Sequence, residues 1–298
     1  MFEKVIIPFN FLRDSRYAIE CLKENPELRQ LVLLHIVYNK YPSHVPDVAS
    51  PEADYARLRL EELVKGLELP GVQVKAVVEE ITGGEISDVI SRIAEREGTS
   101  LVVMGRRERG RVETLFLGSA ASDVLRHSAM DLLLVHAEGD DDSERDEVVG
   151  HCPGLFSNVL ICTDFSEPDI GVICHQELPW IRHATLFHVV TPGDSPEKMR
   201  SAIDSAHANL ETMREEFLRA GIPAQARVCE GSAADEILAF SEQEDVSLII
   251  LKSTGKRGFL TKLLGSTTAK VARSTRKPVL ILKRSILGKS GAVEELLP

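Results

Sequence analysis

A basic, glycine-containing loop over residues 252–267 carries the residues best suited to chemistry. In this stretch, KSTGKRGFLTKLLGST, Gly255 and Gly265 bracket nine residues, and Ser266 and Thr267 stand at the start of a predicted helix. Glycine lets the backbone approach an anion closely, and the hydroxyls would add to the free amides of the helix's first turn. The stretch predicts a phosphate-binding loop, or else a helix capped by Ser266 after an exposed basic loop. These residues alone leave both interpretations open.

Other chemistries that residue spacing can identify find no support. The segment GKS at 288–290 has no glycine five positions before Gly288, so it is not a Walker A loop, and no GxSxG elbow occurs. The five cysteines form no CxxC pair, and we interpret them as buried or inert thiols. His35 and His188 stand at matching strand ends, and we interpret both as packing or loop-anchoring residues. No catalytic residue and no metal ligand is predicted.

The elements that must position the loop occur twice along the chain. KVIIPFN (4–10) matches NVLICTD (158–164), and LVLLHIV (31–37) matches ATLFHVV (184–190). Helical patterns of ten residues or more separate the apolar strands, which predicts right-handed βαβ crossovers and a parallel sheet covered on both faces. We expect an α/β fold of two tandem doubly wound domains, each with a five-stranded parallel sheet flanked by helices.

The domain boundary is predicted by a change in composition. Residues 137–154, AEGDDDSERDEVVGHCPG, are acidic, contain glycine and lack periodic apolar residues, as is typical of an exposed linker. We therefore place the first domain at 1–138 and the second at 156–298.

Composition excludes several classes of partner. The net charge of -11 and the pI near 5.4 give a surface that repels phosphate backbones, so no nucleic-acid partner is expected. No run of about eighteen apolar residues occurs, and the start MFEKVIIPF lacks the features of a signal peptide. We expect a cytoplasmic protein without a membrane association.

Three separated motifs resemble those of the universal stress protein family. The loop spacing G-x-x-G, nine residues, then G-(S/T), between a strand and a helix, is the first of them. TDFSE (163–167) is similar to the family's first loop, and HVV (188–190) to the end of its second strand. The resemblance covers nearly the whole chain as a tandem two-domain member, and it implies an adenine nucleotide alpha hydrolase-like fold.

The resemblance also implies a ligand and the residues that hold it. The second domain would bind ATP or another adenine nucleotide, with Mg²⁺ on the phosphates as an option. Asp164 can accept hydrogen bonds from an amino group or a ribose hydroxyl, although it could also cap the helix opening at SEPD, a role for which Ser166 competes. By resemblance the adenine contacts are Thr163, Asp164 and Val189, and the phosphate contacts are Gly255, Gly265, Ser266 and Thr267.

The loops also depart from the family pattern. In the second domain Lys252 replaces the first glycine of the loop motif, where its side chain could grip a phosphate or obstruct the pocket. Lys256 adds a weaker cationic candidate. The first domain keeps Gly105, Gly118 and Ser119 as weaker candidates.

Two further substitutions weaken the first domain's loop. Glu108 stands at the position of the loop motif's second glycine, and Asn10 stands where the second domain has Asp164. We therefore expect a weak or lost site there, and we interpret its arginine run (106, 107, 109 and 111) as a solvated loop.

These observations predict a stress-response regulator or adaptor that binds an adenine nucleotide through its C-terminal domain. The alternative is a nucleotide-free interaction or scaffold protein with degenerate loops. No residue is identifiable that would position an attacking water, so an enzyme is not expected, and slow ATP hydrolysis is left open. Family members commonly dimerise through their last strands, so residues 132–136 and 279–283 are expected to pair within one chain. A homodimer is left open, and the protein partner is unknown.

Overall fold

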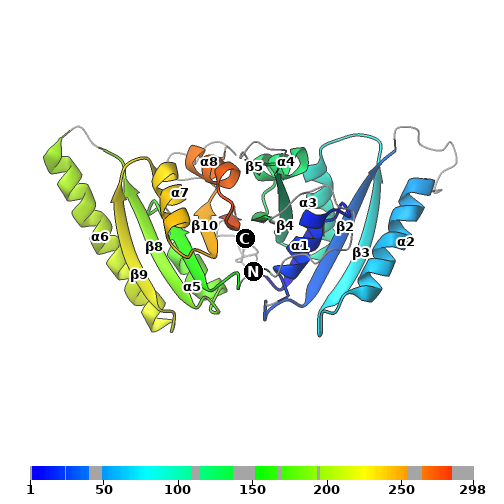
Figure 1. Cartoon of the computed structure of the whole chain (residues 1–298), viewed down its shortest axis with the longest axis horizontal. Helices are drawn as coiled ribbons and strands as arrows, with labels where there is room; N and C mark the ends of the chain where they lie inside the picture. The colour runs from blue at the N-terminus through cyan, green and yellow to red at the C-terminus, as the bar shows by residue number, and fades with distance from the viewer. Residues whose placement is uncertain are drawn as a thin grey trace, which may run out of the picture. The chain divides into compact units, whose positions relative to one another are not determined.

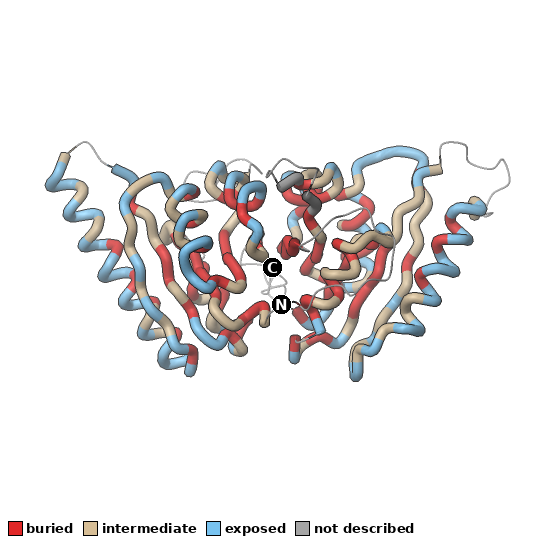
Figure 2. The backbone as a smooth tube through the Cα atoms, viewed as in Figure 1, coloured by how far each residue is buried: buried red, intermediate tan, exposed pale blue. Residues whose placement is uncertain are grey.

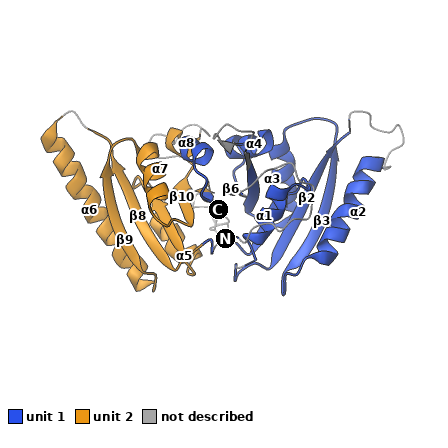
Figure 3. Ribbon diagram, in the orientation of Figure 1, with its two compact units in different colours: residues 1–155, 269–280 blue, residues 156–268, 281–298 orange. Residues whose placement is uncertain are grey.

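The chain folds into two compact units, shown in different colours in Figure 3. Unit 1 comprises Met1–Leu155 with Ala269–Leu280, and unit 2 comprises Phe156–Thr268 with Ile281–Pro298. The structure is a computed structural model, and it describes residues 2–23, 25–39, 49–108, 115–136, 152, 154–166, 169–192, 195–253 and 264–283.

Unit 1 contains a five-stranded parallel sheet in the order β3-β2-β1-β4-β6, with the short strand β5 pairing antiparallel to β4. Figure 1 shows α2 lying along β3. The elements are β1 Lys4–Pro8, α1 Arg13–Glu20, β2 Gln30–Tyr38, α2 Pro51–Gly66, β3 Gln73–Ile81, α3 Ile86–Glu97, β4 Leu101–Glu108, β5 Leu115–Phe116, α4 Ser119–His127 and β6 Asp131–His136.

Unit 2 repeats this topology, with strand order β9-β8-β7-β10-β11, and α8 and β11 continue across the boundary between the units. The helix α6 packs along β8 and β9. The elements are β7 Asn158–Cys162, α5 Ile170–Glu177, β8 His183–Val190, α6 Pro196–Arg219, β9 Ala224–Glu230, α7 Ala233–Gln243, β10 Leu248–Lys252, α8 Ser266–Ser274 and β11 Val279–Leu282.

Burial follows the apolar pattern of each strand (Figure 2). Every residue of β6 and of β11 is buried, as continuous apolar runs require in a sheet that helices flank. In the outer strands β3 and β9, exposed and partly buried residues alternate along much of each strand. The prediction of two doubly wound α/β halves with five-stranded parallel sheets is confirmed.

The repeat extends to the atoms of the first loop in each unit. Phe11 and Phe165 both adopt a positive φ, of 64° and 57°. The Phe11 ring packs against His35 with ring centroids 4.9 Å apart, and the Phe165 ring packs against His188 with centroids 4.4 Å apart. Each histidine Nδ1 donates to the main-chain oxygen two residues before that phenylalanine, at 2.7 and 2.8 Å. The interpretation of both histidines as loop-anchoring residues is confirmed.

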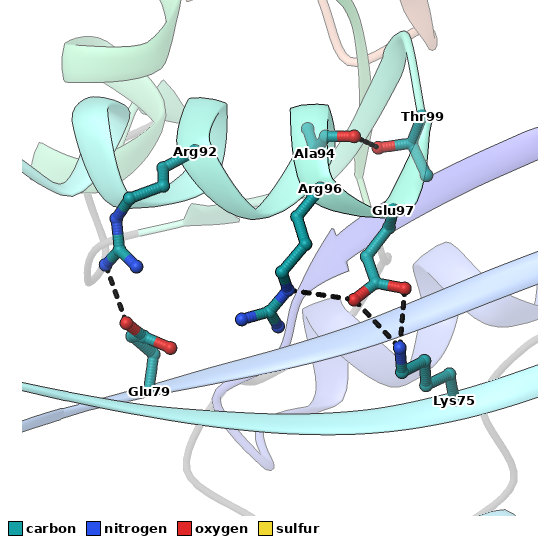
Figure 4. A network of polar contacts seen from close by, with 7 residues as sticks. All are labelled: Lys75, Glu79, Arg92, Ala94, Arg96, Glu97 and Thr99. Atoms are coloured by element: carbon teal, nitrogen blue, oxygen red, sulfur yellow. Dashed lines mark hydrogen bonds and ion pairs between the residues drawn. The ribbon is translucent and has the colours of Figure 1, made fainter.

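A polar network fastens α3 to the outer strand β3 (Figure 4). Lys75 Nζ contacts both carboxylate oxygens of Glu97 at 2.7 and 2.9 Å, and Arg96 Nε donates to the same carboxylate at 3.1 Å. Arg92 pairs with Glu79 at 2.6 Å. The hydrogen bond from Lys75 lowers the pKa of Glu97 against the opposing effect of burial, with Arg96 contributing.

The interpretation of all five cysteines as free thiols is wrong for one pair. Cys21 and Cys152 form a disulfide with Cα atoms 5.0 Å apart. Cys162 and Cys174 are buried free thiols, and Cys229 is a half-buried one. Sequence spacing could not reveal this pair, because its members lie 131 residues apart.

In the segments that the structure describes, no helix combines the length and the apolar character that crossing a membrane requires.

Candidate functional site

The predicted site residues of unit 2 gather at the carboxyl edge of its parallel sheet. Thr163 and Asp164 directly follow β7, Val189 stands next to last in β8, and Gly265 directly precedes α8. Thr163 is buried, whereas Asp164 and Val189 are half-buried. In doubly wound sheets this edge, where the strand order reverses, forms the usual ligand crevice.

Side-chain hydrogen bonds fix the loop after β7. Thr163 Oγ1 accepts from the Phe165 amide at 2.9 Å, and Asp164 Oδ1 accepts from the Ser166 amide at 3.1 Å and from its hydroxyl at 2.5 Å. Such bonds to amides two residues ahead close tight turns. The loop is therefore held in one shape by its own side chains.

The expectation that Asp164 or Ser166 caps the following helix is wrong. The helix α5 begins later, at Ile170, and its cap is Asp169, whose Oδ1 accepts from the Gly171 amide at 2.6 Å. Several polar residues precede this helix, so composition alone could not select the cap. Asp164 lies at the carboxyl edge of the sheet and does not cap α5.

Lys252 connects β10 to the loop after β7. Its Nζ donates to Ser166 at two atoms, the main-chain oxygen at 3.0 Å and the hydroxyl at 2.9 Å. Its main-chain oxygen accepts from the hydroxyl of Thr268, in the first turn of α8, at 2.6 Å. The ammonium group therefore lies between the ends of β7 and β10.

The N-terminus of α8 lies beside the end of β10. The Gly265 amide donates to the Ser253 oxygen at 2.7 Å, and Ser266 begins the helix instead of capping it from outside. Ser266 is exposed and Thr267 half-buried. The loop residues Gly255 and Lys256 lie outside the described residues.

Unit 1 shows why the lysine matters. A Cβ atom added to Gly105 would stand 2.7 Å from the main-chain oxygen of Asp14 and closer still to that residue's Cβ. Only glycine allows α1 to approach β4 so closely. Lys252 takes the matching position in unit 2, where α5 begins at Ile170, the counterpart of Arg16 and thus later than the start of α1. The described part of α5 and the start of α1 therefore differ next to this position.

The weaker candidates of unit 1 lie at the start of α4. Gly118 precedes the helix, a Cβ there would meet no atom within 4 Å, and Ser119 is exposed. Glu108 ends β4, and its side chain, like residues 109–114, lies outside what the structure describes.

The arginine run of unit 1 is not simply a solvated loop, because Arg106 is 1% exposed. Its guanidinium donates to main-chain oxygens of Ala272 at 3.0 Å, Thr275 at 2.7 Å and Lys277 at 2.6 Å, all within unit 1. Burial lowers the pKa of Arg106 to about 10. No spacing signal distinguishes this arginine from those that follow, and its partners are distant in sequence.

A cavity in unit 2 lies away from these residues. A cavity of about 430 Å³ is formed at the amino-terminal ends of β7, β8 and β9, with Asn158, His183 and Asp245 among its lining residues. No predicted site residue lines it. The predicted site residues that the structure describes lie at the opposite edge of the sheet.

Tandem parallel sheets, each with a loop-and-helix arrangement at its carboxyl edge, define a class of doubly wound α/β proteins. The universal stress protein family model matches residues 1–136 and 156–283, and the chain belongs to this family.

Individual relatives agree with this assignment. A universal stress protein of Methanocaldococcus jannaschii is 32% identical over 88 residues, which cover 30% of this chain and 50% of that protein. One of Mycolicibacterium smegmatis is 24% identical over 192 residues, 63% of each chain. The M. jannaschii match thus spans about half of that relative's length.

A solved structure shares the fold of nearly the whole chain. The crystal structure of a universal stress protein from Archaeoglobus fulgidus superposes with a TM-score of 0.70 at 21% identity, and the match covers 96% of this chain and 100% of that one. At this identity the likeness shows the fold alone.

Proposed function

We propose that unit 2 binds ATP or another adenine nucleotide and that the protein acts as a stress-response regulator or adaptor. One observation carries the proposal. The hydrogen bonds of Lys252 bring the loop after β7 and the first turn of α8 to one edge of the sheet, next to the residues matched to the family's ligand contacts.

The phosphates would be held by the N-terminus of α8. The first amides of a helix have no partner within the helix, and together with the helix dipole they favour an anion. Ser266 and Thr267 supply these amides, and Gly265, Gly255 and Lys256 would complete the loop.

The adenosine moiety would lie against the ends of β7 and β8. Asp164 offers carboxylate oxygens to a ribose hydroxyl or an amino group, while Thr163 and Val189 form the adjoining wall. The loop fixed by Thr163 and Asp164 is already shaped before a ligand arrives, which lowers the cost of ordering it on binding.

Lys252 would exchange its partners when the nucleotide binds. Its ammonium donates to neutral oxygens of Ser166, whereas phosphate oxygens are charged and accept stronger hydrogen bonds. We propose that the lysine grips a phosphate and that its contact with Ser166 holds it ready in the free protein.

We propose no nucleotide site in unit 1. The close approach of Asp14 to Gly105 fills the position that Lys252 occupies in unit 2, and Arg106 is already committed to main-chain oxygens. Gly118 and Ser119 would then serve only to start α4.

The proposed activity is binding and not catalysis. Phosphoryl transfer needs a positioned nucleophile and stabilisation of the transferred group, and Mg²⁺ on the phosphates would assist binding first. Homodimerisation stays a prediction, which light scattering on the purified protein tests.

A nucleotide-free adaptor is the second candidate, and one observation favours it. The Lys252 ammonium already satisfies two oxygens of Ser166 across the crevice, so it could act as a permanent plug. The protein would then act through its surfaces alone.

Two measurements separate these functions. The purified protein is denatured by heat and any released nucleotide is identified, and its melting temperature is then measured with and without ATP and Mg²⁺. A ligand at 100 times its Kd stabilises the native state by about 2.7 kcal/mol, which raises Tm measurably.

The internal repeat supplies matched control variants. Gly265→Val and Asp164→Ala should abolish the shift in Tm, whereas Gly118→Val and Asn10→Ala, the corresponding changes in unit 1, should leave it intact. A wild-type protein that neither carries nucleotide nor responds to ATP would favour the adaptor without nucleotide.

A further inference from the structure

The disulfide between Cys21 and Cys152 lies apart from the candidate nucleotide site. Cys21 directly follows α1, and Cys152 lies between the two regions that match the family, 1–136 and 156–283. Their side chains are buried, since the two residues are 4% and 5% exposed. The Cα separation of 5.0 Å suits a disulfide without movement of the backbone.

The remaining three cysteines differ from this pair because none of them is paired with a second cysteine. Burial also raises the pKa of Cys162 and of Cys174, so both stay protonated at neutral pH. Burial also raises the pKa of the half-buried Cys229, with Glu236 adding to the effect. Thiol oxidation proceeds through the thiolate, and none of these three sulfurs is bonded to a second cysteine.

We propose that Cys21 and Cys152 form a reversible redox site, with glutathione disulfide as the oxidant of the reduced pair. One cysteine thiolate attacks a sulfur of glutathione disulfide, forms a mixed disulfide and expels one glutathione thiolate. The second cysteine, after losing its proton to water, attacks the protein sulfur of that mixed disulfide and expels the second glutathione. Two protein thiols are oxidised by two electrons, and one glutathione disulfide becomes two glutathione molecules.

The geometry favours formation of the Cys21–Cys152 disulfide over accumulation of the mixed disulfide with glutathione. Once either cysteine carries glutathione, its partner is held at the distance that the bond requires. The partner's effective concentration then exceeds that of dissolved thiols. Because both sulfurs are buried, entry of glutathione requires local opening at the end of α1, a helix of eight residues.

The bond would change the stability of the protein and not its fold. It closes a loop with a sequence separation of 131 and thereby limits the unfolded chain, and it joins Cys152 to the residue that follows α1. Oxidising conditions would therefore produce a more heat-resistant form, which suits a protein of a stress family.

The test uses the full-length protein equilibrated in glutathione buffers from fully reduced to fully oxidised. Free thiols are trapped with a maleimide after acid quenching and denaturation, and each cysteine is assigned by peptide mass spectrometry. Cys21 and Cys152 should lose reactivity together in one reversible transition, while the other three cysteines stay reactive. The oxidised form should melt roughly 5–15 °C above the reduced form.

Variants separate the bond from a general effect of oxidant. Cys152→Ala should abolish the difference in Tm between the two buffers, and the control Cys229→Ser should preserve it. Because the wild-type protein is itself compared in two redox states, the test does not depend on how well a variant folds. Thiols at 21 and 152 that stay reactive in oxidised glutathione would overturn the proposal, and so would a bond that reduced glutathione cannot open in the native protein.

Discussion

Replacing Lys252 by methionine tests how the nucleotide's phosphates are recognised. Methionine keeps an unbranched apolar side chain but removes the ammonium group that donates to Ser166 at 3.0 and 2.9 Å. The carboxyl edge of the sheet should otherwise keep its shape, because the loop after β7 is also held by Thr163 and Asp164.

The expected loss of ATP affinity in Lys252→Met follows from an exchange of hydrogen bonds. Hydrogen bonds to charged acceptors contribute roughly 1.5–3 kcal/mol, and those lost from Ser166 on binding offset about 1 kcal/mol of this. Lys252 is half-buried, so solvent screens the remainder. The remaining loss of at most about 0.5–2 kcal/mol corresponds to a Kd for ATP that is higher by a factor of roughly 2 to 30. Adenosine carries no phosphate, so its affinity should not change.

Isothermal titration calorimetry with ATP–Mg²⁺ and with adenosine measures both effects. Lys65→Met is the control, because it removes an exposed lysine from the last turn of α2 in unit 1. Lys252→Gly restores the residue type found at Gly105 and should also weaken ATP binding. The reasoning is refuted if ATP binds either Lys252 variant more tightly, because the side chain would then obstruct the pocket.

Three further substitutions test the structural argument. Arg106→Met should lower the free energy of unfolding by about 2–4 kcal/mol in urea titrations, because buried main-chain oxygens lose their donor. Glu97→Gln should lower the free energy of unfolding at pH 7 by only about 0.5–1 kcal/mol, because solvent screens an ion pair whose partner Lys75 is 47% exposed. The folded-state pKa of Glu97 lies below its ordinary value of 4.5, so this difference is present above pH 4.5 and disappears as the pH falls through the folded-state value. Asp169→Ala removes the side-chain oxygen that caps α5, so it should lower the free energy of unfolding by about 1 kcal/mol and increase amide hydrogen exchange at the start of α5.

The sequence predicts the sheet well because its inner strands, such as β1, β7 and β10, are largely buried runs of apolar residues. The stretches around β1 and β7, and those around β2 and β8, match in residue type and in strand-end polarity, and their parallel pairing follows from the helices between them. The matched histidines His35 and His188 likewise reveal their anchoring role, because each repeats at the end of a strand.

The sequence-based predictions for Arg106 and for the cysteines are wrong because both depend on contacts between residues distant in the chain. Arg106 is separated from its acceptor at Lys277 by 171 residues, and Cys21 from Cys152 by 131. Neither separation leaves a periodic or spaced pattern. The cap of α5 is a different case, because several polar residues precede the helix and the one that caps it, Asp169, lies closest to its start.

Calorimetric titration of nucleotide-free wild-type protein with ATP and Mg²⁺ tests the central claim most directly. We predict saturable binding of one nucleotide per chain that is lost in Gly265→Val and retained in Gly118→Val. Absence of binding to the wild-type protein, or equal binding to both glycine variants, would contradict the assignment of the site to unit 2.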